Sequence, residues 1–130
     1  MGVGISGLHH VAIICRDYER SVAFYTDVLG FEVLKKTYRA ERDSYKIDLM
    51  LQGRYMLELF SFPNSPDRPS WPEALGLRHI AFEVGDLEKA INHLARRSIS
   101  YEPVRIDNLT GKKFVFFSDP DGLPLELYEK

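Results

Sequence analysis

The hydrophobic and polar positions of the chain follow one pattern twice. The stretch GLHHVAI at residues 7–13 returns 69 positions later as GLRHIAF at residues 76–82. Each copy has the character of a strand and is followed by an aspartate, Asp17 or Asp86, a residue type that caps helices. This agreement predicts that two copies of one structural unit make up the chain.

Apolar residues recur at helical spacing after each aspartate. The spacing predicts helices over residues 18–29 and 87–97, each with one buried face. Gly30 is suited to the left-handed conformation that ends a helix. The first helix is therefore expected to stop at this glycine.

Three short extended runs follow each predicted helix. They are residues 31–40, 45–51 and 55–62 in the first copy, and 101–106, 112–118 and 123–129 in the second. Turn residues separate the last two runs in each copy, at 52–53 and at 119–122. The pattern predicts an α+β fold made of two tandem βαβββ modules.

The modules are expected to share one domain over residues 1–130. The first module spans residues 5–62 and the second spans 76–130. Four prolines interrupt residues 63–75, which are therefore predicted to form a linker. A chain of 130 residues is of ordinary single-domain length.

Composition narrows the classes of partner. The net charge is −2 and the pI is near 6.1, so the chain offers no basic field for nucleic acid or for a membrane surface. It has neither an apolar run long enough to span a membrane nor a signal peptide, and we expect a cytoplasmic protein. Cys15 is the single cysteine, which excludes an intrachain disulfide and a cysteine-based zinc site. Cys15 is expected to be a small buried apolar group.

Two histidines and two glutamates occupy matching places in the two copies. His10 and His79 begin the first strand of each copy, and Glu58 and Glu126 lie in the LEL motif of the last strand. One such residue alone is usually structural, but a carboxylate inside an apolar strand needs solvent or a cation. Two imidazoles and two carboxylates suit a divalent ion such as Ni, Zn, Co, Mn or Fe. The repetition of the pair therefore predicts a metal site made of these four residues.

His9 lies directly before the first predicted ligand. Side chains alternate along a strand, which predicts that His9 points to the face opposite His10. The counterpart of His9 in the second copy is Arg78, so the duplication maintains only the second residue of each pair. We therefore expect His9 not to be a ligand.

The motifs resemble those of the vicinal oxygen chelate superfamily, and specifically of its glyoxalase I-like members. They are residues 9–31, the LEL around Glu58, residues 77–86 and DPDGLPLELYE at 119–129, so the resemblance covers essentially the whole chain. It is greatest to the small bacterial YaeR/YwkD-like branch. The resemblance implies the glyoxalase/bleomycin-resistance/dihydroxybiphenyl-dioxygenase fold and often a homodimer whose sites are completed by both chains.

The resemblance also implies a reaction. In glyoxalase I the corresponding residues hold a metal ion, and a small metabolite chelated through two oxygens loses a proton beside its carbonyl. The motif match makes Glu126 the expected proton shuttle, with Glu58 second. Dioxygenase and fosfomycin-resistance members typically lack a ligand at the place of Glu58, so a glutamate there favours lyase or isomerase chemistry. An Fe-dependent extradiol dioxygenase and a non-catalytic drug- or metabolite-binding protein are the alternatives.

One departure concerns the substrate. Glyoxalase I commonly has an Arg and an Asn for glutathione where this chain has Ile14 and Phe62. The departure counts against the glutathione hemithioacetal as the substrate. The candidates for replacement anion contacts are Arg39, Arg42 and Lys46, or alternatively Lys112 and Lys113, although basic residues at such a strand edge are more often simply solvated.

Overall fold

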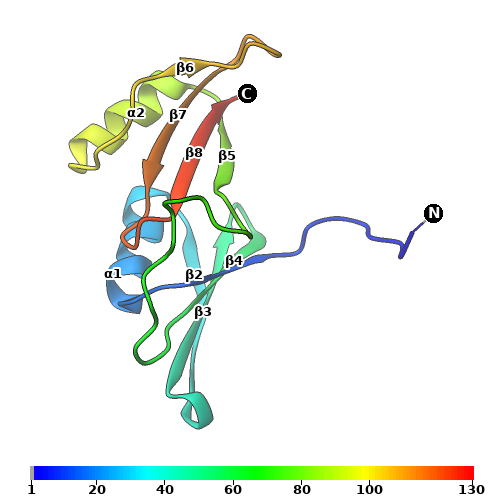
Figure 1. Cartoon of the computed structure of the whole chain (residues 1–130), viewed down its shortest axis with the longest axis vertical. Coiled ribbons are helices and arrows are strands. Elements are labelled where there is room, and N and C mark those ends of the chain that lie inside the picture. Colours follow the sequence, from blue (N-terminus) through cyan, green and yellow to red (C-terminus); the bar gives the residue numbers. More distant parts are fainter. Residues whose placement is uncertain (1) are drawn as a thin grey trace. The chain divides into compact units, whose positions relative to one another are not determined.

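Each half of the chain folds into a four-stranded sheet accompanied by one helical segment (Figure 1). The computed structural model describes residues 2–130. The chain divides into two compact units, Met1–Ser65 and Pro66–Lys130. Both units have the βαβββ order, which confirms the predicted α+β fold.

The first unit holds the first sheet. Its elements are β1 (Val11–Ile14), α1 (Tyr18–Ala23), β2 (Glu32–Arg39), a 3-10 turn (Ala40–Arg42), β3 (Ser44–Leu51) and β4 (Arg54–Phe60). The strands lie in the order β1-β4-β3-β2, with β1 parallel to β4 and the other pairs antiparallel. The first strand along the chain therefore lies at the edge of the sheet, next to the last strand, and residues 10 and 58 are close together.

The second unit repeats this topology. Its elements are β5 (Ile80–Val84), α2 (Leu87–Arg96), β6 (Arg105–Ile106), β7 (Lys113–Ser118) and β8 (Pro124–Glu129). The order is β5-β8-β7-β6, and β5 runs parallel to β8. The predicted caps are present, since the Asp17 and Asp86 side chains accept from backbone N–H groups of the first turns of α1 and α2.

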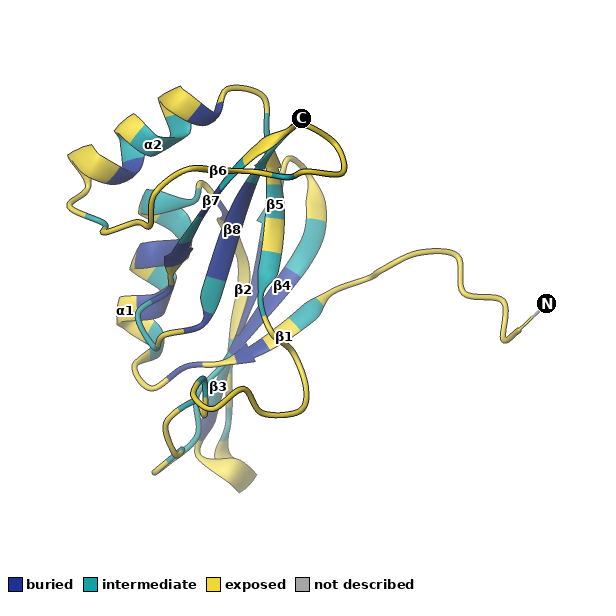
Figure 2. Cartoon of the chain, turned by 45° about the horizontal axis from the view of Figure 1, so that its top comes forward, coloured by how far each residue is buried: buried dark blue, intermediate teal, exposed yellow. Residues whose placement is uncertain are grey.

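Alternation along β4 separates an apolar face from a polar one. Leu57 and Leu59 are buried together with Ile47 and Leu49 of β3, and α1 contacts β4. Figure 2 shows buried segments of the strands in dark blue. Cys15 is 1 % exposed, as expected of a small apolar group. Glu58 lies between the two leucines and points to the other face, where the candidate site is found.

Two elements of the structure differ in detail from those predicted from the sequence. The first helix changes at Phe24 into a π-helical turn, Phe24–Val28, and ends before Gly30, whose φ of 87° is left-handed as expected. The predicted strand at 101–106 is mostly wrong, because only Arg105–Ile106 forms a strand and Tyr101 makes an isolated bridge to Phe117. Pro103 lies between them and has no N–H for a ladder.

Hydropathy adds one further observation. Within residues 2–130, no helix has both the length and the apolar character needed to cross a membrane.

Candidate functional site

The site in the first unit is built around two carboxylates on neighbouring strands. Asp48 of β3 and Glu58 of β4 are directly opposite each other in the antiparallel ladder. Each residue is 8 % exposed. Like charges directly opposite each other destabilise a sheet, and burial increases that cost. The fold must therefore supply compensating groups.

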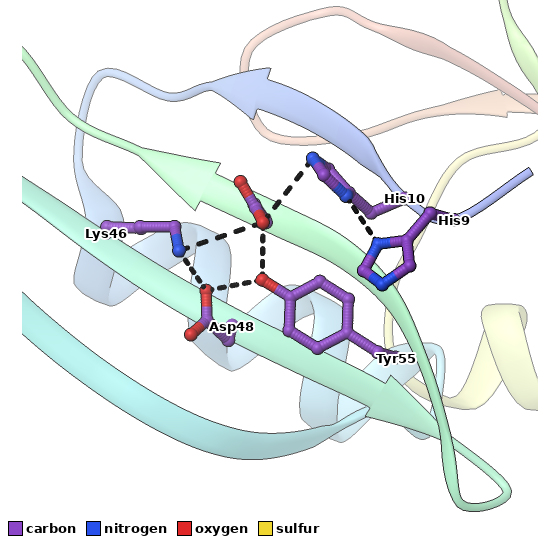
Figure 3. Close-up of polar contacts among 6 residues, drawn as sticks. His9, His10, Lys46, Asp48 and Tyr55 are labelled. Atoms are coloured by element: carbon purple, nitrogen blue, oxygen red, sulfur yellow. Dashed lines mark hydrogen bonds and ion pairs between the residues drawn. The ribbon is translucent and has the colours of Figure 1, made fainter.

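Tyr55 and Lys46 are those groups (Figure 3). The Tyr55 hydroxyl is 2.8 Å from Asp48 Oδ1 and is also hydrogen-bonded to Glu58 Oε2. Lys46 Nζ is 3.1 Å from Asp48 Oδ1 and 3.7 Å from Glu58 Oε2. One phenol proton and one ammonium group thus serve two carboxylates, and the cluster keeps one net negative charge.

The environment of Tyr55 keeps its hydroxyl protonated. Burial raises the pKa of Tyr55, and the hydrogen bonds to Glu58 and Asp48 raise it further, because both carboxylates oppose a phenolate. Tyr55 therefore acts as a hydrogen-bond donor at neutral pH.

Sequence reasoning missed Tyr55 because of a β-bulge. Strict alternation puts Met56, and not Tyr55, on the face of Glu58. The register of β3 with β4 shifts between Leu49 and Met50, so that Leu49 pairs with Leu57 but Met50 pairs with Tyr55. The extra residue brings the Tyr55 side chain to the carboxylates. Nothing in the local sequence marks this bulge.

His10 completes the first cluster. His10 Nε2 lies 3.4 Å from Glu58 Oε2. The predicted orientation of His9 is wrong: its Nδ1 lies 2.8 Å from His10 Nδ1, and its ring centroid lies 5.3 Å from that of Tyr55. The reason is that β1 begins at Val11, so strand alternation does not apply to the two histidines.

The second unit contains the corresponding pair with different neighbours. His79 Nε2 lies 3.1 Å from Glu126 Oε1. The residue directly opposite Glu126 is Phe116, and His79 packs edge-on against its ring at 5.0 Å. His79 Nδ1 is buried and has no hydrogen-bond partner among residues 2–130.

The two glutamates therefore differ in how many side chains hold them in place. In the described part of the chain, Glu58 contacts the side chains of His10, Tyr55 and Lys46. Glu126, in contrast, has His79 as its side-chain partner. The second carboxylate is the less restrained of the two.

Each histidine–glutamate pair has a spacing that fits metal ligation. Donor atoms bound at about 2.1 Å to one ion lie roughly 3.0 to 3.4 Å apart at octahedral or tetrahedral angles. The observed separations are 3.4 Å and 3.1 Å. Among residues 2–130, no group of three or more His, Cys, Asp or Glu side chains is placed to hold an ion, so each unit offers two donors.

Comparisons with known proteins place the chain among relatives of the same architecture. The model of the family described as Glyoxalase/Bleomycin resistance protein/Dioxygenase superfamily matches residues 7–127. "Uncharacterized protein YwkD" of Bacillus subtilis is 60% identical over 97% of this chain and 98% of its own length, and "Uncharacterized protein YaeR" of Escherichia coli is 55% identical over 98% and 99%. The crystal structure of a glyoxalase family protein from Enterococcus faecalis has a TM-score of 0.89 and 50% identity, over 95% of this chain and 98% of that one.

Proposed function

Because the chain belongs to the glyoxalase/bleomycin resistance protein/dioxygenase superfamily, we propose that it is a metal-dependent lyase or isomerase of the glyoxalase I type. Its substrate would be a small metabolite that chelates the ion through two adjacent oxygens and gains and loses a proton on carbon. The observation that carries the proposal is the histidine–glutamate pair, which occurs at ligand spacing in both units.

The proposed metal ligands are His10, Glu58, His79 and Glu126. Nitrogen and oxygen donors of this kind suit Ni, Zn, Co, Mn or Fe. Lys46 offsets one of the two carboxylates Asp48 and Glu58, so the first unit keeps one negative charge beside His10. Glu126 supplies one negative charge beside His79 in the second unit. A divalent cation that takes one pair of each kind would neutralise both charges.

The environments of the two glutamates support different roles. A bound divalent ion supplies Lewis-acid stabilisation of the negative charge that develops on two substrate oxygens when a neighbouring carbon loses its proton. Glu58, restrained by Tyr55 and Lys46, is suited to remain a ligand. Glu126, with fewer partners, is suited to leave the ion and carry the proton from one carbon to the next. Glu58 is the second choice for this shuttle.

Relatives with named activities lie at lower identity. They include a 2-epi-5-epi-valiolone epimerase (29%), a metallothiol transferase FosB (28%), Glyoxylase I 4 of Arabidopsis thaliana (26%) and a catechol-2,3-dioxygenase of Bacillus subtilis (30%), of which the chain covers 40%. Epimerisation at carbon requires a bond to carbon to be broken and remade, often by proton transfer. The fold thus serves several reactions, and the function must be argued from the site.

The deciding experiment combines metal analysis with one substitution. Purified protein should bind one divalent ion per site, and the loaded enzyme should be screened with α-oxoaldehyde hemithioacetals and epimerisable thioesters. Glu126→Gln should abolish turnover and leave the circular dichroism spectrum unchanged. Failure to bind any divalent ion, or full activity of Glu126→Gln, would overturn the proposal. Oxygen uptake with catechols by anaerobically Fe-loaded protein would indicate the dioxygenase instead.

A second experiment asks whether one chain or two supply the ligands of each site. We expect a homodimer whose sites each take one pair from each chain. His10→Ala and His79→Ala would each be inactive alone. Mixed dimers of the two variants would then regain one intact site if the ligands are shared between chains, and none if they are not.

A further inference from the structure

Two arginines lie over two phenylalanines on the first sheet. We call this surface the Arg-Phe platform, and it consists of Arg39, Arg42, Phe60 and Phe62. The two phenyl rings are stacked, with centroids 6.0 Å apart and planes 5° from parallel. Arg39 Cζ lies 5.1 Å from the Phe60 centroid, and Arg42 Cζ lies 4.8 Å from the Phe62 centroid. Stacking holds both guanidinium groups in place.

The described residues provide no counter-charge for either guanidinium group. Within residues 2–130, no carboxylate forms an ion pair with Arg39 or Arg42. Arg39 Nε is buried and has no hydrogen-bond partner in the same part of the chain. A buried donor without an acceptor is costly, and an oriented guanidinium suits a carboxylate or a phosphate. Simple solvation of a strand edge does not account for the buried Nε.

The platform begins next to the proposed metal ligand Glu58. Phe60 is two residues further along β4 and lies on the same face, since the register of this part of the ladder is regular. The two Cα atoms are therefore about 7 Å apart. Lys46 pairs with Phe60 across the ladder, and its ammonium reaches Glu58. The platform and the proposed ligand therefore lie on one face of the same strand, where a single small metabolite could contact both.

The second unit differs in its arginine. Arg105 Cζ lies 5.5 Å from the centroid of Phe116, but its guanidinium is paired with Glu102 at 2.6 Å.

The position that corresponds to the platform is also different. By strand register, the counterpart of Arg39 is Asp107 and the counterpart of Phe60 is Tyr128. The Tyr128 hydroxyl donates to Asp107 Oδ2 at 2.9 Å, so this position is acidic and already partnered. Among residues 2–130, two arginines stacked on phenyl rings without a carboxylate partner are found in the first unit, which argues against a role in the repeated fold itself.

We propose that the Arg-Phe platform binds a carboxylate or phosphate group of the substrate, at the end opposite to its two chelating oxygens. The inference rests on the proposed function for the chelating end, and it narrows the substrate class to anionic metabolites. The guanidinium groups provide the charge-assisted hydrogen bonds, and the phenyl rings provide an apolar surface for the carbon chain.

The first test uses EDTA-treated, metal-free protein and does not depend on the metal. Inorganic phosphate and succinate are titrated calorimetrically into the wild type and into Arg39→Gln/Arg42→Gln. We expect the double variant to lose about tenfold in affinity, as fits the loss of a charge-assisted hydrogen bond. The matched control is Lys89→Gln/Arg96→Gln, which makes the same charge change at exposed positions of α2 and should bind like the wild type. Arg42→Gln alone, at an exposed turn, provides a variant with little risk to folding.

The second test uses metal-loaded protein and paired ligands. 2-Hydroxyglutarate is compared with 2-hydroxybutyrate, and 3-phosphoglycerate with glycerate, because the members of each pair share a chelating end and differ in the remote anion. The wild type should prefer the anionic member, and Arg39→Gln/Arg42→Gln should remove that preference without changing metal affinity. The preferred pair distinguishes carboxylate from phosphate.

The outcomes separate this inference from the proposed function. Equal phosphate affinity in the double variant and its control, or no detectable binding at millimolar phosphate and succinate, overturns the inference whether or not the metal binds. Loss of metal binding with intact, arginine-dependent anion binding overturns the proposed function and retains the anion site.

Discussion

Asp48 and Glu58 are directly opposite each other on β3 and β4, and the hydroxyl of Tyr55 joins their carboxylates. Two buried like charges in one ladder are tolerated because a donor and the Lys46 ammonium compensate them. The same contacts fix the orientation of Glu58 before any ion binds. Partners that orient a metal ligand in this way commonly contribute 10- to 100-fold to metal affinity.

Tyr55→Phe removes the hydroxyl and keeps the ring. We expect the affinity for divalent ions to fall about tenfold or more, because Glu58 loses the donor that orients it. Competition with a chromophoric chelator measures the change. Tyr38→Phe is the control, since the Tyr38 hydroxyl bonds to Asp43 in an exposed turn. Equal affinities in the two variants would show that Tyr55 has no part in holding the ligand.

His9 and Arg78 occupy equivalent positions in the two copies, so the effects of substituting them can be compared directly. His9 Nδ1 contacts His10 Nδ1 at 2.8 Å, which leaves His10 Nε2 directed at Glu58. Arg78 makes a 3.9 Å contact with Glu73 at the surface, an interaction of little energetic value. His9→Ala should therefore weaken metal binding about tenfold, whereas Arg78→Ala should leave it unchanged. The same calorimetric or chelator assay serves both, and the opposite ranking would contradict the role given to His9.

The left-handed backbone of Gly30 ends the first helical segment, and a substitution at this position tests that assignment. Its φ of 87° is left-handed, and a Cβ placed there would meet no atom within 4 Å, so only backbone strain opposes a side chain. Gly30→Ala should lower the free energy of unfolding by about 1 kcal/mol. Gly85→Ala is the matched control, because Gly85 also has open space but does not have a left-handed φ. Urea unfolding of both variants checks the difference, and a neutral Gly30→Ala would refute the assignment.

The sequence by itself determined the architecture. The repeated strand, helix cap and LEL motifs are local signals, and they placed the two βαβββ modules, the caps at Asp17 and Asp86 and the left-handed Gly30. They also singled out His10, Glu58, His79 and Glu126 as one set. The structure places His10 beside Glu58 and His79 beside Glu126, because β1 lies next to β4 and β5 lies next to β8. The joint use of the four residues as metal ligands remains a prediction.

Only the tertiary structure decided what surrounds each pair. A bulge in β4 brings Tyr55 to the carboxylates, register places Asp48 opposite Glu58 but Phe116 opposite Glu126, and the late start of β1 turns His9 toward His10. These features depend on cross-strand register and on where a strand begins. Both are set by packing between segments that are distant in the sequence, so no local pattern could reveal them.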